Sequence, residues 1–130
     1  VAMRALIDTH TFLWHIEGSP KLSVQAREVI DSSVNDLFLS VASLWEIAIK
    51  LGLNKLSLEN SFSELEGLLT ELEIELLPIA FSDTNQYLAL PLHHRDPFDR
   101  MLIAQAITNS LIIVSADTAF DAYDVQRMWE

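Results

Sequence analysis

Short, almost wholly apolar runs alternate along the chain with longer amphipathic segments. Short apolar runs bounded by turn residues are typical of buried strands, and apolar residues three or four apart are typical of helices. The predicted strands are 3–7, 37–40, 74–79, 111–115 and 125–129, and the predicted helices are 9–16, 24–34, 41–51, 61–72, 82–90 and 97–108. Strands alternating with helices indicate a parallel sheet covered on both faces. We therefore expect one layered α/β domain over residues 1–130.

Local signals predict where several helices begin and which face they bury. Ser23 is a suitable N-cap for the helix over 24–34, and Pro97 suits the first position of a helix, which makes Asp96 the natural N-cap there. The apolar face expected for the helix over 24–34 comprises Ala26, Val29, Ile30 and Val34. The face expected for the helix over 61–72 comprises Phe62, Leu65, Leu68, Leu69 and Leu72.

Composition narrows the class of protein. Half of the 130 residues are apolar and only 3 Gly and 4 Pro interrupt the chain, which excludes disordered and collagen-like proteins. The absence of cysteine removes disulfides, thiolate metal sites and a cysteine nucleophile, and it fits a reducing compartment. No apolar run reaches the length of a membrane span, and residues 1–4 are too short for a signal peptide. We expect a cytoplasmic protein without a membrane association.

The formal net charge is −11, from 19 acids and 8 bases. Such a charge opposes long-range attraction to nucleic acid, because phosphate binding normally uses Lys and Arg. If several acids hold cations, however, the local field is reversed. The remaining acidic surface suits a basic protein partner.

Four acids stand inside or just after strongly apolar stretches: Asp8, Glu46, Asp99 and Asp117. Burying a carboxylate without a partner costs several kcal/mol, so acids at such places suggest a shared counter-ion. Asp8 and Asp117 follow predicted strands, and ligands of parallel sheets bind outside the carboxyl ends of the strands. Oxygen ligands favour Mg²⁺ or Mn²⁺, and an ion of this kind suits the hydrolysis of a phosphodiester.

Each of these acids also has a purely structural interpretation. Asp8 and Asp117 can cap the helices that follow them, Glu46 can pair with Lys50, and Asp99 can face a helix dipole. Four such coincidences at the expected mouth of one sheet favour a metal site in which all four acids are ligands and catalytic residues.

Other residues are assigned supporting roles. Thr9 and Ser115 can hold the ligating acids through hydrogen bonds. Arg95 and Arg100 can contact RNA phosphate or form a structural ion pair with Asp96. The adjacent histidines of the sequence HHR, at positions 93 and 94, are interpreted as a surface pair.

Four segments carry a resemblance to a known family: LIDTH (6–10), SLWEI (43–47), HRDPFDRMLIAQA (94–106) and VSAD (114–117). In these segments the chain resembles the PIN-domain nucleases, specifically the VapC-like toxins of bacterial type II toxin–antitoxin systems. Asp8, Glu46, Asp99 and Asp117 match the family's four acids in order, and Asp96 is an extra acid of one subgroup. The thirteen-residue stretch from His94 is the most specific of the four.

The resemblance implies a PIN-like three-layer α/β/α domain with a central parallel sheet. It also implies a Mg²⁺- or Mn²⁺-dependent endoribonuclease, a small cognate antitoxin that occludes the site, and a homodimer.

Two other functions are compatible with the acids alone. A phosphoacceptor signalling domain is also acidic and doubly wound, but it places a lysine late in the chain, whereas the last lysine here is Lys55. A catalytically silent binding module would keep the acidic pocket without chemistry. An aspartyl-nucleophile phosphatase fits less well, because His10 stands where a second acid is expected.

Overall fold

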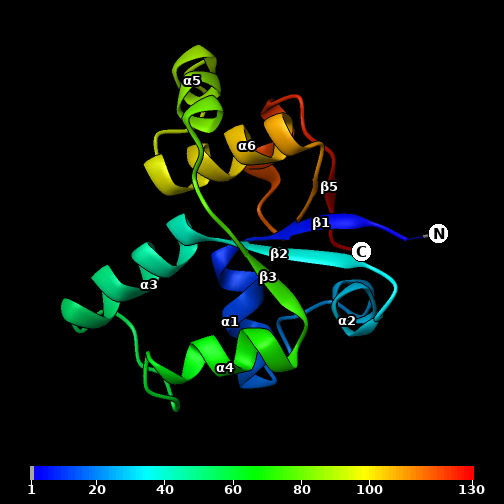
Figure 1. The fold of residues 1–130 in the computed structure, drawn as a ribbon, viewed down its shortest axis with the longest axis vertical. Helices are drawn as coiled ribbons and strands as arrows, with labels where there is room; N and C mark the ends of the chain where they lie inside the picture. Colours follow the sequence, from blue (N-terminus) through cyan, green and yellow to red (C-terminus); the bar gives the residue numbers. More distant parts are fainter. Residues whose placement is uncertain (1) are drawn as a thin grey trace.

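The computed structural model describes residues 2–130 and contains a five-stranded, wholly parallel sheet (Figure 1). The strands are β1 (Arg4–Ile7), β2 (Asp36–Ser40), β3 (Ile74–Leu77), β4 (Ile112–Val114) and β5 (Arg127–Met128). The helices are α1 (Thr9–Glu17), α2 (Val24–Asp31), α3 (Val41–Gly52), α4 (Glu64–Glu71), α5 (Phe81–Ala89), α6 (Pro97–Asn109) and the 3-10 helix η1 (Thr118–Ala122). The α/β fold with a central parallel sheet is confirmed.

The strand order β3-β2-β1-β4-β5 places β1 at the centre of the sheet. β2 lies beside β1 and β3 lies beyond β2, whereas β4 and β5 lie on the opposite side of β1. The direction of winding therefore changes between β1 and β4. In open parallel sheets a change of this kind leaves a crevice at the carboxyl ends of the two strands.

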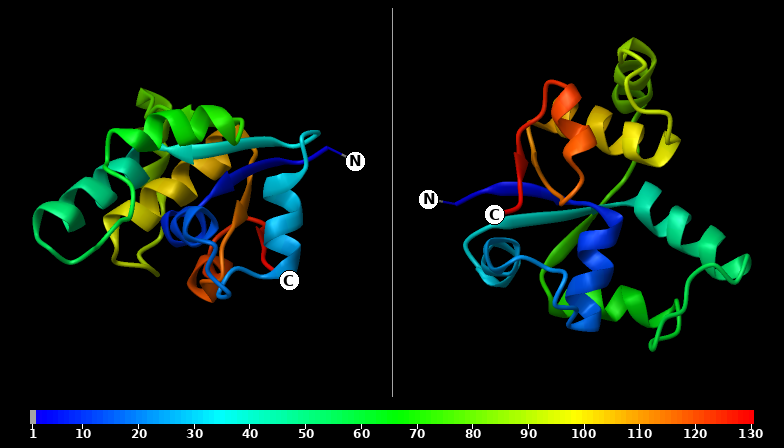
Figure 2. Two further views of the ribbon diagram at one scale, coloured as in Figure 1. Left: turned by 90° about the horizontal axis from the view of Figure 1, so that it is seen from below. Right: turned by 180° about the vertical axis from the view of Figure 1, so that it is seen from behind.

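Side chains of β1 alternate between two cores, as a strand with both faces covered requires. Ala5 and Ile7 belong to the core cluster that includes residues of α1, α2 and α4, whereas Leu6 belongs to the cluster formed mainly with α6. Figure 1 shows α1, α2 and α4 below the sheet and α5 and α6 above it, and Figure 2 shows the same layers from two other sides. The expected three-layer arrangement is therefore present.

The register brings the ends of the three central strands to one level. Ile7 of β1 pairs with Leu39 of β2 and with Val114 of β4. The chain therefore continues from three neighbouring positions at the same edge of the sheet. Asp8 follows β1 directly, and Ser115 follows β4. This edge is where the predicted acids are expected to meet.

The predicted helix starts agree with the structure at two N-caps. The Ser23 hydroxyl accepts a hydrogen bond from the Ala26 amide at 3.0 Å. One carboxylate oxygen of Asp96 accepts from the Phe98 amide at 2.8 Å, and Pro97 is the first residue of α6. None of the helices in residues 2–130 is both long and apolar enough to span a bilayer.

Two helices are shorter than the sequence predicted. α2 ends at Asp31, and Val34 is 64% exposed in the following turn rather than on the buried face. The Asn35 side chain holds this turn, because it accepts from the Met3 amide and donates to the Val29 carbonyl, both at 2.9 Å.

α4 begins at Glu64 rather than at position 61, so the expected position of Phe62 on a helical face is also wrong. The Glu64 carboxylate accepts from the Ser61 amide at 2.9 Å and ties the preceding turn to the first residue of the helix. The last strand, β5, covers only two residues of the predicted 125–129.

Two glycines give a test of this backbone. Gly18 has φ +64° at the end of α1, whereas Gly67 lies within α4, and a Cβ at either would meet no atom within 4 Å. We expect Gly18→Ala to lower the free energy of unfolding by about 1 kcal/mol through left-handed strain, and Gly67→Ala to raise it by about 0.5–1 kcal/mol through helix propensity. Urea unfolding measures both changes. Equal effects of the two substitutions would contradict the left-handed backbone at Gly18 and the helical backbone at Gly67.

Candidate metal centre

Asp8 lies buried at the end of β1, where it caps α1. Its Oδ1 accepts from the Thr11 amide at 2.9 Å, and its Oδ2 accepts from the Ser115 hydroxyl at 2.5 Å. Burial raises the pKa of Asp8 above its ordinary value, although these hydrogen bonds act in the opposite direction. The fold therefore keeps a carboxylate at a place where its charge is costly.

Glu46 lies in the middle of α3 and is buried. Its Oε1 accepts from the Thr9 hydroxyl and its Oε2 from the Lys50 ammonium group, both at 2.8 Å. The pair with Lys50 is the one that the sequence allowed as a structural alternative, but the glutamate is enclosed rather than exposed. Thr9 follows Asp8 directly, so its hydroxyl fixes Glu46 beside the end of β1.

Asp99 lies in the first turn of α6, half-buried, one turn after the N-cap Asp96. Its pKa is raised to about 7, first by burial and then by the negative charges of four neighbouring carboxylates: Asp96, Glu46, Asp8 and Asp117. Each of these groups lies near enough to disfavour the ionised form of Asp99. The structure thus brings the other three acids within electrostatic range of Asp99. Among the described residues, Asp117 also joins Asp99 in a group of ligand atoms that lie within 4.8 Å of one another, and this group does not include Asp8 or Glu46.

Asp117 follows β4 and caps η1, with its Oδ1 accepting from the Ala119 amide at 2.9 Å. Its side chain is 47% exposed, so it forms the open side of the cluster. Ser115 connects it to Asp8, because the Ser115 hydroxyl donates to Asp8 and accepts from the Asp117 amide at 3.0 Å. One serine therefore holds both acids at the carboxyl ends of β1 and β4.

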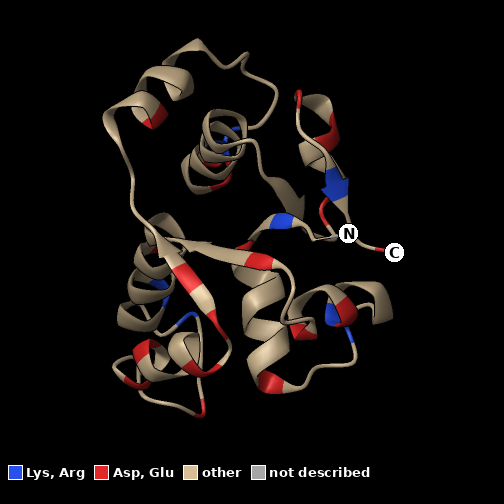
Figure 3. Cartoon of the chain, turned by 45° about the vertical axis from the view of Figure 1, so that its right-hand side comes forward, with Lys and Arg blue, Asp and Glu red and all other residues tan. Residues whose placement is uncertain are grey.

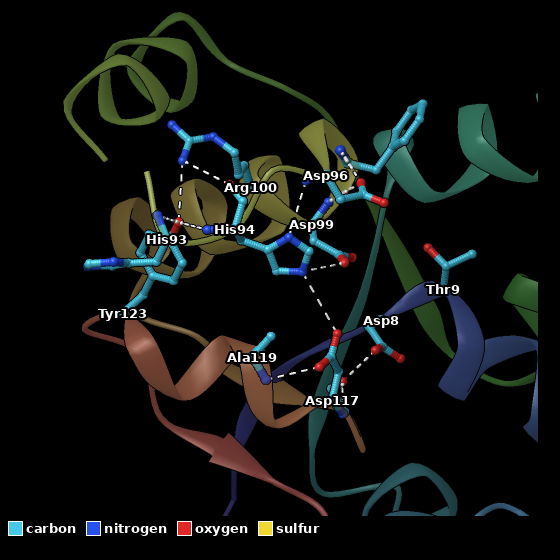
Figure 4. Close-up of polar contacts among 12 residues, drawn as sticks. Asp8, Thr9, His93, His94, Asp96, Asp99, Arg100, Asp117, Ala119 and Tyr123 are labelled. Carbon is cyan, nitrogen blue, oxygen red and sulfur yellow. Dashed lines mark hydrogen bonds and ion pairs between the residues drawn. The ribbon is translucent and has the colours of Figure 1, made fainter. Parts of the chain in front are cut away.

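Arg100 does not take the place that the sequence suggested. It is buried, and its guanidinium donates to the Pro91 carbonyl at 3.0 Å and lies 3.3 Å from the Tyr123 hydroxyl (Figure 4). This position does not fit an ion pair with Asp96 or a contact with RNA phosphate, because the charged end is turned into the protein. Arg95, in contrast, is exposed.

His94 belongs to the cluster, although the sequence placed it in a surface pair. Its Nε2 lies 3.1 Å from Asp99 Oδ2 and 3.9 Å from Asp117 Oδ2, and its side chain is only 18% exposed (Figure 4). Its position two residues before the N-cap of α6 places its backbone near the first turn of that helix, but no local signal in the sequence shows that its ring turns toward Asp99.

The residues present fit a divalent cation. In the described part of the chain, ligand-type atoms of His94, Asp99 and Asp117 all lie within 4.8 Å of one another. Carboxylate oxygens dominate the cluster, and this donor set suits Mg²⁺ or Mn²⁺. The pKa of Asp99 is raised first by burial and then by the charges of nearby carboxylates, and a bound cation would oppose both effects. Beside the cluster a hollow of about 340 Å³ is lined by Asp8, His10, Trp14, Ala116 and Asp117.

The sheet topology and the acidic edge define an α/β protein with a candidate metal centre at its topological switch point. The family model of the PIN domain matches residues 5–126, so the chain belongs to the PIN domain family, a family of nucleases. The resemblance drawn from the four sequence segments is thereby confirmed for the family.

Solved structures share the fold. The structure of VapBC2 from Rickettsia felis bound to a promoter DNA fragment matches with a TM-score of 0.73 and 18% identity, over 98% of this chain and 100% of that one. FitAcB from Neisseria gonorrhoeae matches with 0.67 and 20%, over 95% and 96%. VapBC-1 from nontypeable Haemophilus influenzae matches with 0.68 and 16%, over 97% of each chain. No curated protein matches the chain.

The raised pKa of Asp99 predicts that replacing its carboxylate stabilises the metal-free protein at high pH. In the metal-free protein the folded state keeps a proton on Asp99 up to about pH 7, whereas the unfolded chain loses it near pH 3.8. Stability therefore falls as the pH rises through this window. Asp99→Asn should make the metal-free protein more stable at pH 8 by roughly 1–3 kcal/mol, with little difference at pH 3.

Urea unfolding at the two pH values measures this effect, and Asp124→Asn, an exposed aspartate outside the cluster, is the control. Parallel pH profiles for the parent and Asp99→Asn would contradict it.

Proposed function

We propose that this chain is a Mg²⁺- or Mn²⁺-dependent endoribonuclease that works as one PIN-like domain. The concentration of carboxylates around Asp99 carries the proposal, because such an arrangement needs a cation to be stable in its ionised form. Membership of the PIN domain family supports the same chemistry.

In this proposal Asp8 and Asp99 are the main metal ligands, and Glu46 and Asp117 complete the site directly or through water. A divalent ion bound there supplies an activated water and stabilises the charge on the leaving oxygen. Ser115 and Thr9 keep Asp8 and Glu46 in place through the hydrogen bonds described above. The exposed side of Asp117 leaves an approach for the RNA backbone.

The toxin role and the antitoxin partner are proposed from the solved structures that share this fold. The similar structures include VapBC and FitAcB assemblies, and another is described as a toxin–antitoxin complex from Klebsiella pneumoniae.

A small antitoxin with basic residues suits the acids on α4, in the loop after it and on β3 (Figure 3). Beside them an apolar hollow of about 360 Å³ is lined by Leu44, Phe62, Ser63, Leu65, Glu66, Leu69 and Leu76. The proposed location is the cytoplasm, where RNA and antitoxin are both made.

The proposed homodimer is supported by exposed apolar residues on α5 and in the loop after it. Phe81, Leu88 and Leu92 are 88%, 83% and 73% exposed. Between positions 78 and 94 the only Asp, Glu, Lys or Arg is Asp83, which is buried and accepts hydrogen bonds from the Ala80 amide and the Thr108 hydroxyl. Two copies with a net charge of −11 each can meet here with little repulsion.

Removal of single carboxylates tests the nuclease. We expect Asp8→Asn and Asp99→Asn to lower the rate of Mn²⁺-dependent RNA cleavage by at least about 100-fold, because even partners of metal ligands contribute 10–100-fold. Cleavage of a fluorescent RNA under single-turnover conditions measures the rates, and Asp124→Asn should cleave like the parent. Undiminished cleavage by both cluster variants would reject the site, and no cleavage by the parent would favour a silent binding module.

A charge on α5 tests the dimer. We expect the parent to have twice the chain mass in light scattering, and Leu88→Asp to shift the protein to a monomer, since the symmetric contact would bring two new charges together. Leu53→Asp is the matched control, because Leu53 is 59% exposed but lies after α3. A monomeric parent, or a dimeric Leu88→Asp protein, would rule out this interface.

A further inference from the structure

His94 stands between two carboxylates of the candidate metal centre, and its ring can serve there as a ligand or as a hydrogen-bond donor. It lies in the loop before α6, with Nε2 facing Asp99 and Asp117 (Figure 4). These two roles exclude each other, because a ring nitrogen that coordinates a cation must offer its lone pair, whereas a donor carries the hydrogen.

The other ring nitrogen decides between the two roles. Nδ1 of His94 accepts a hydrogen bond from the Asp96 amide at 3.2 Å. A backbone amide only donates, so Nδ1 holds a lone pair and no hydrogen. In a neutral imidazole with an unprotonated Nδ1 the hydrogen is on Nε2. The ring therefore presents an N–H group to Asp99 Oδ2 at 3.1 Å.

Backbone contacts on both sides of His94 hold the ring in this orientation. Its amide donates to the Tyr123 hydroxyl at 2.7 Å, and its carbonyl lies 3.4 Å from the Arg100 guanidinium. The Tyr123 hydroxyl in turn donates to the Pro91 carbonyl at 2.9 Å, and Arg100 donates to the same carbonyl. Arg100 and Tyr123 are both buried, so they fix the loop from inside the protein.

We propose that His94 is a positioning residue for the metal centre, and that Arg100 and Tyr123 hold it in place. Its Nε2–H group donates to Oδ2 of Asp99, so that Oδ1 would be the oxygen available to hold a divalent ion. The same N–H group places positive partial charge between Asp99 and Asp117. This inference rests on the proposed function, because it assumes that Asp99 binds a divalent ion.

Three variants test the donor. We expect His94→Leu to weaken Mn²⁺ binding at least 10-fold, as is usual when the hydrogen-bond partner of a metal ligand is lost. His94→Gln keeps an N–H donor and should recover most of the affinity. His15→Leu is the matched control, because His15 lies in the last turn of α1 and contacts Asp31 at 3.1 Å instead of any residue of the metal centre. Calorimetric titration with Mn²⁺ measures the affinities.

Nuclear magnetic resonance of the ¹⁵N-labelled ring tests the assignment without catalysis. The expected spectrum has the hydrogen on Nε2 and none on Nδ1, with or without Mg²⁺. Loss of the Nε2 hydrogen on addition of Mg²⁺ would overturn the proposal in favour of direct coordination. Tyr123→Phe removes the hydroxyl that accepts from the His94 amide but keeps the His94 side chain, and it should also weaken Mn²⁺ binding. This variant tests the proposal if His94→Leu does not fold.

The outcomes separate this inference from the proposed function. A parent protein that binds no Mn²⁺ rejects the metal centre and the role of His94 together. A parent that binds Mn²⁺, with equal affinity in a folded His94→Leu protein, rejects the role of His94 and leaves the metal centre standing.

Discussion

The carboxylates around Asp99 repel one another, and hydrogen bonds from backbone amides offset part of this repulsion. Asp8, Asp96 and Asp117 each accept a hydrogen bond from a backbone amide at the start of a helix. Three helix starts therefore converge on one edge of the sheet. A capping carboxylate gains hydrogen bonds and faces the positive end of the helix dipole. Capping uses only part of the acceptor capacity of a carboxylate, so the structural and the metal-binding interpretations of these acids are compatible.

The topology decides which acids share this edge. β1 and β4 lie side by side with their ends level, so Asp8 and Asp117 come together although more than a hundred residues separate them. α6 packs on the opposite face of the sheet from α1 and brings Asp99 to the same edge. Ser115 then connects the ends of the two strands through its single hydroxyl. The site is thus a product of the change in winding direction between β1 and β4.

Two cationic side chains near the site, Lys50 and Arg100, are engaged by the protein itself, whereas Arg95 is exposed. Lys50 pairs with Glu46, and Arg100 is turned inward to the carbonyls of the loop that carries His94. With a net charge of −11, the protein offers RNA little attraction of its own. In the proposed nuclease a bound divalent ion would supply the chemistry and would reduce the negative local field that the substrate meets.

The sequence by itself determined the alternation of strands and helices and the cap formed by Asp96 before Pro97, and it selected Asp99 together with three acids whose charges act on it. These features follow from periodicity and from contacts within a few residues. The tertiary structure alone decided the exposed positions of Val34 and Phe62, the inward turn of Arg100 and the inclusion of His94. The contact that holds His94 comes from Tyr123, 29 residues later, and no local pattern encodes a partner at that distance.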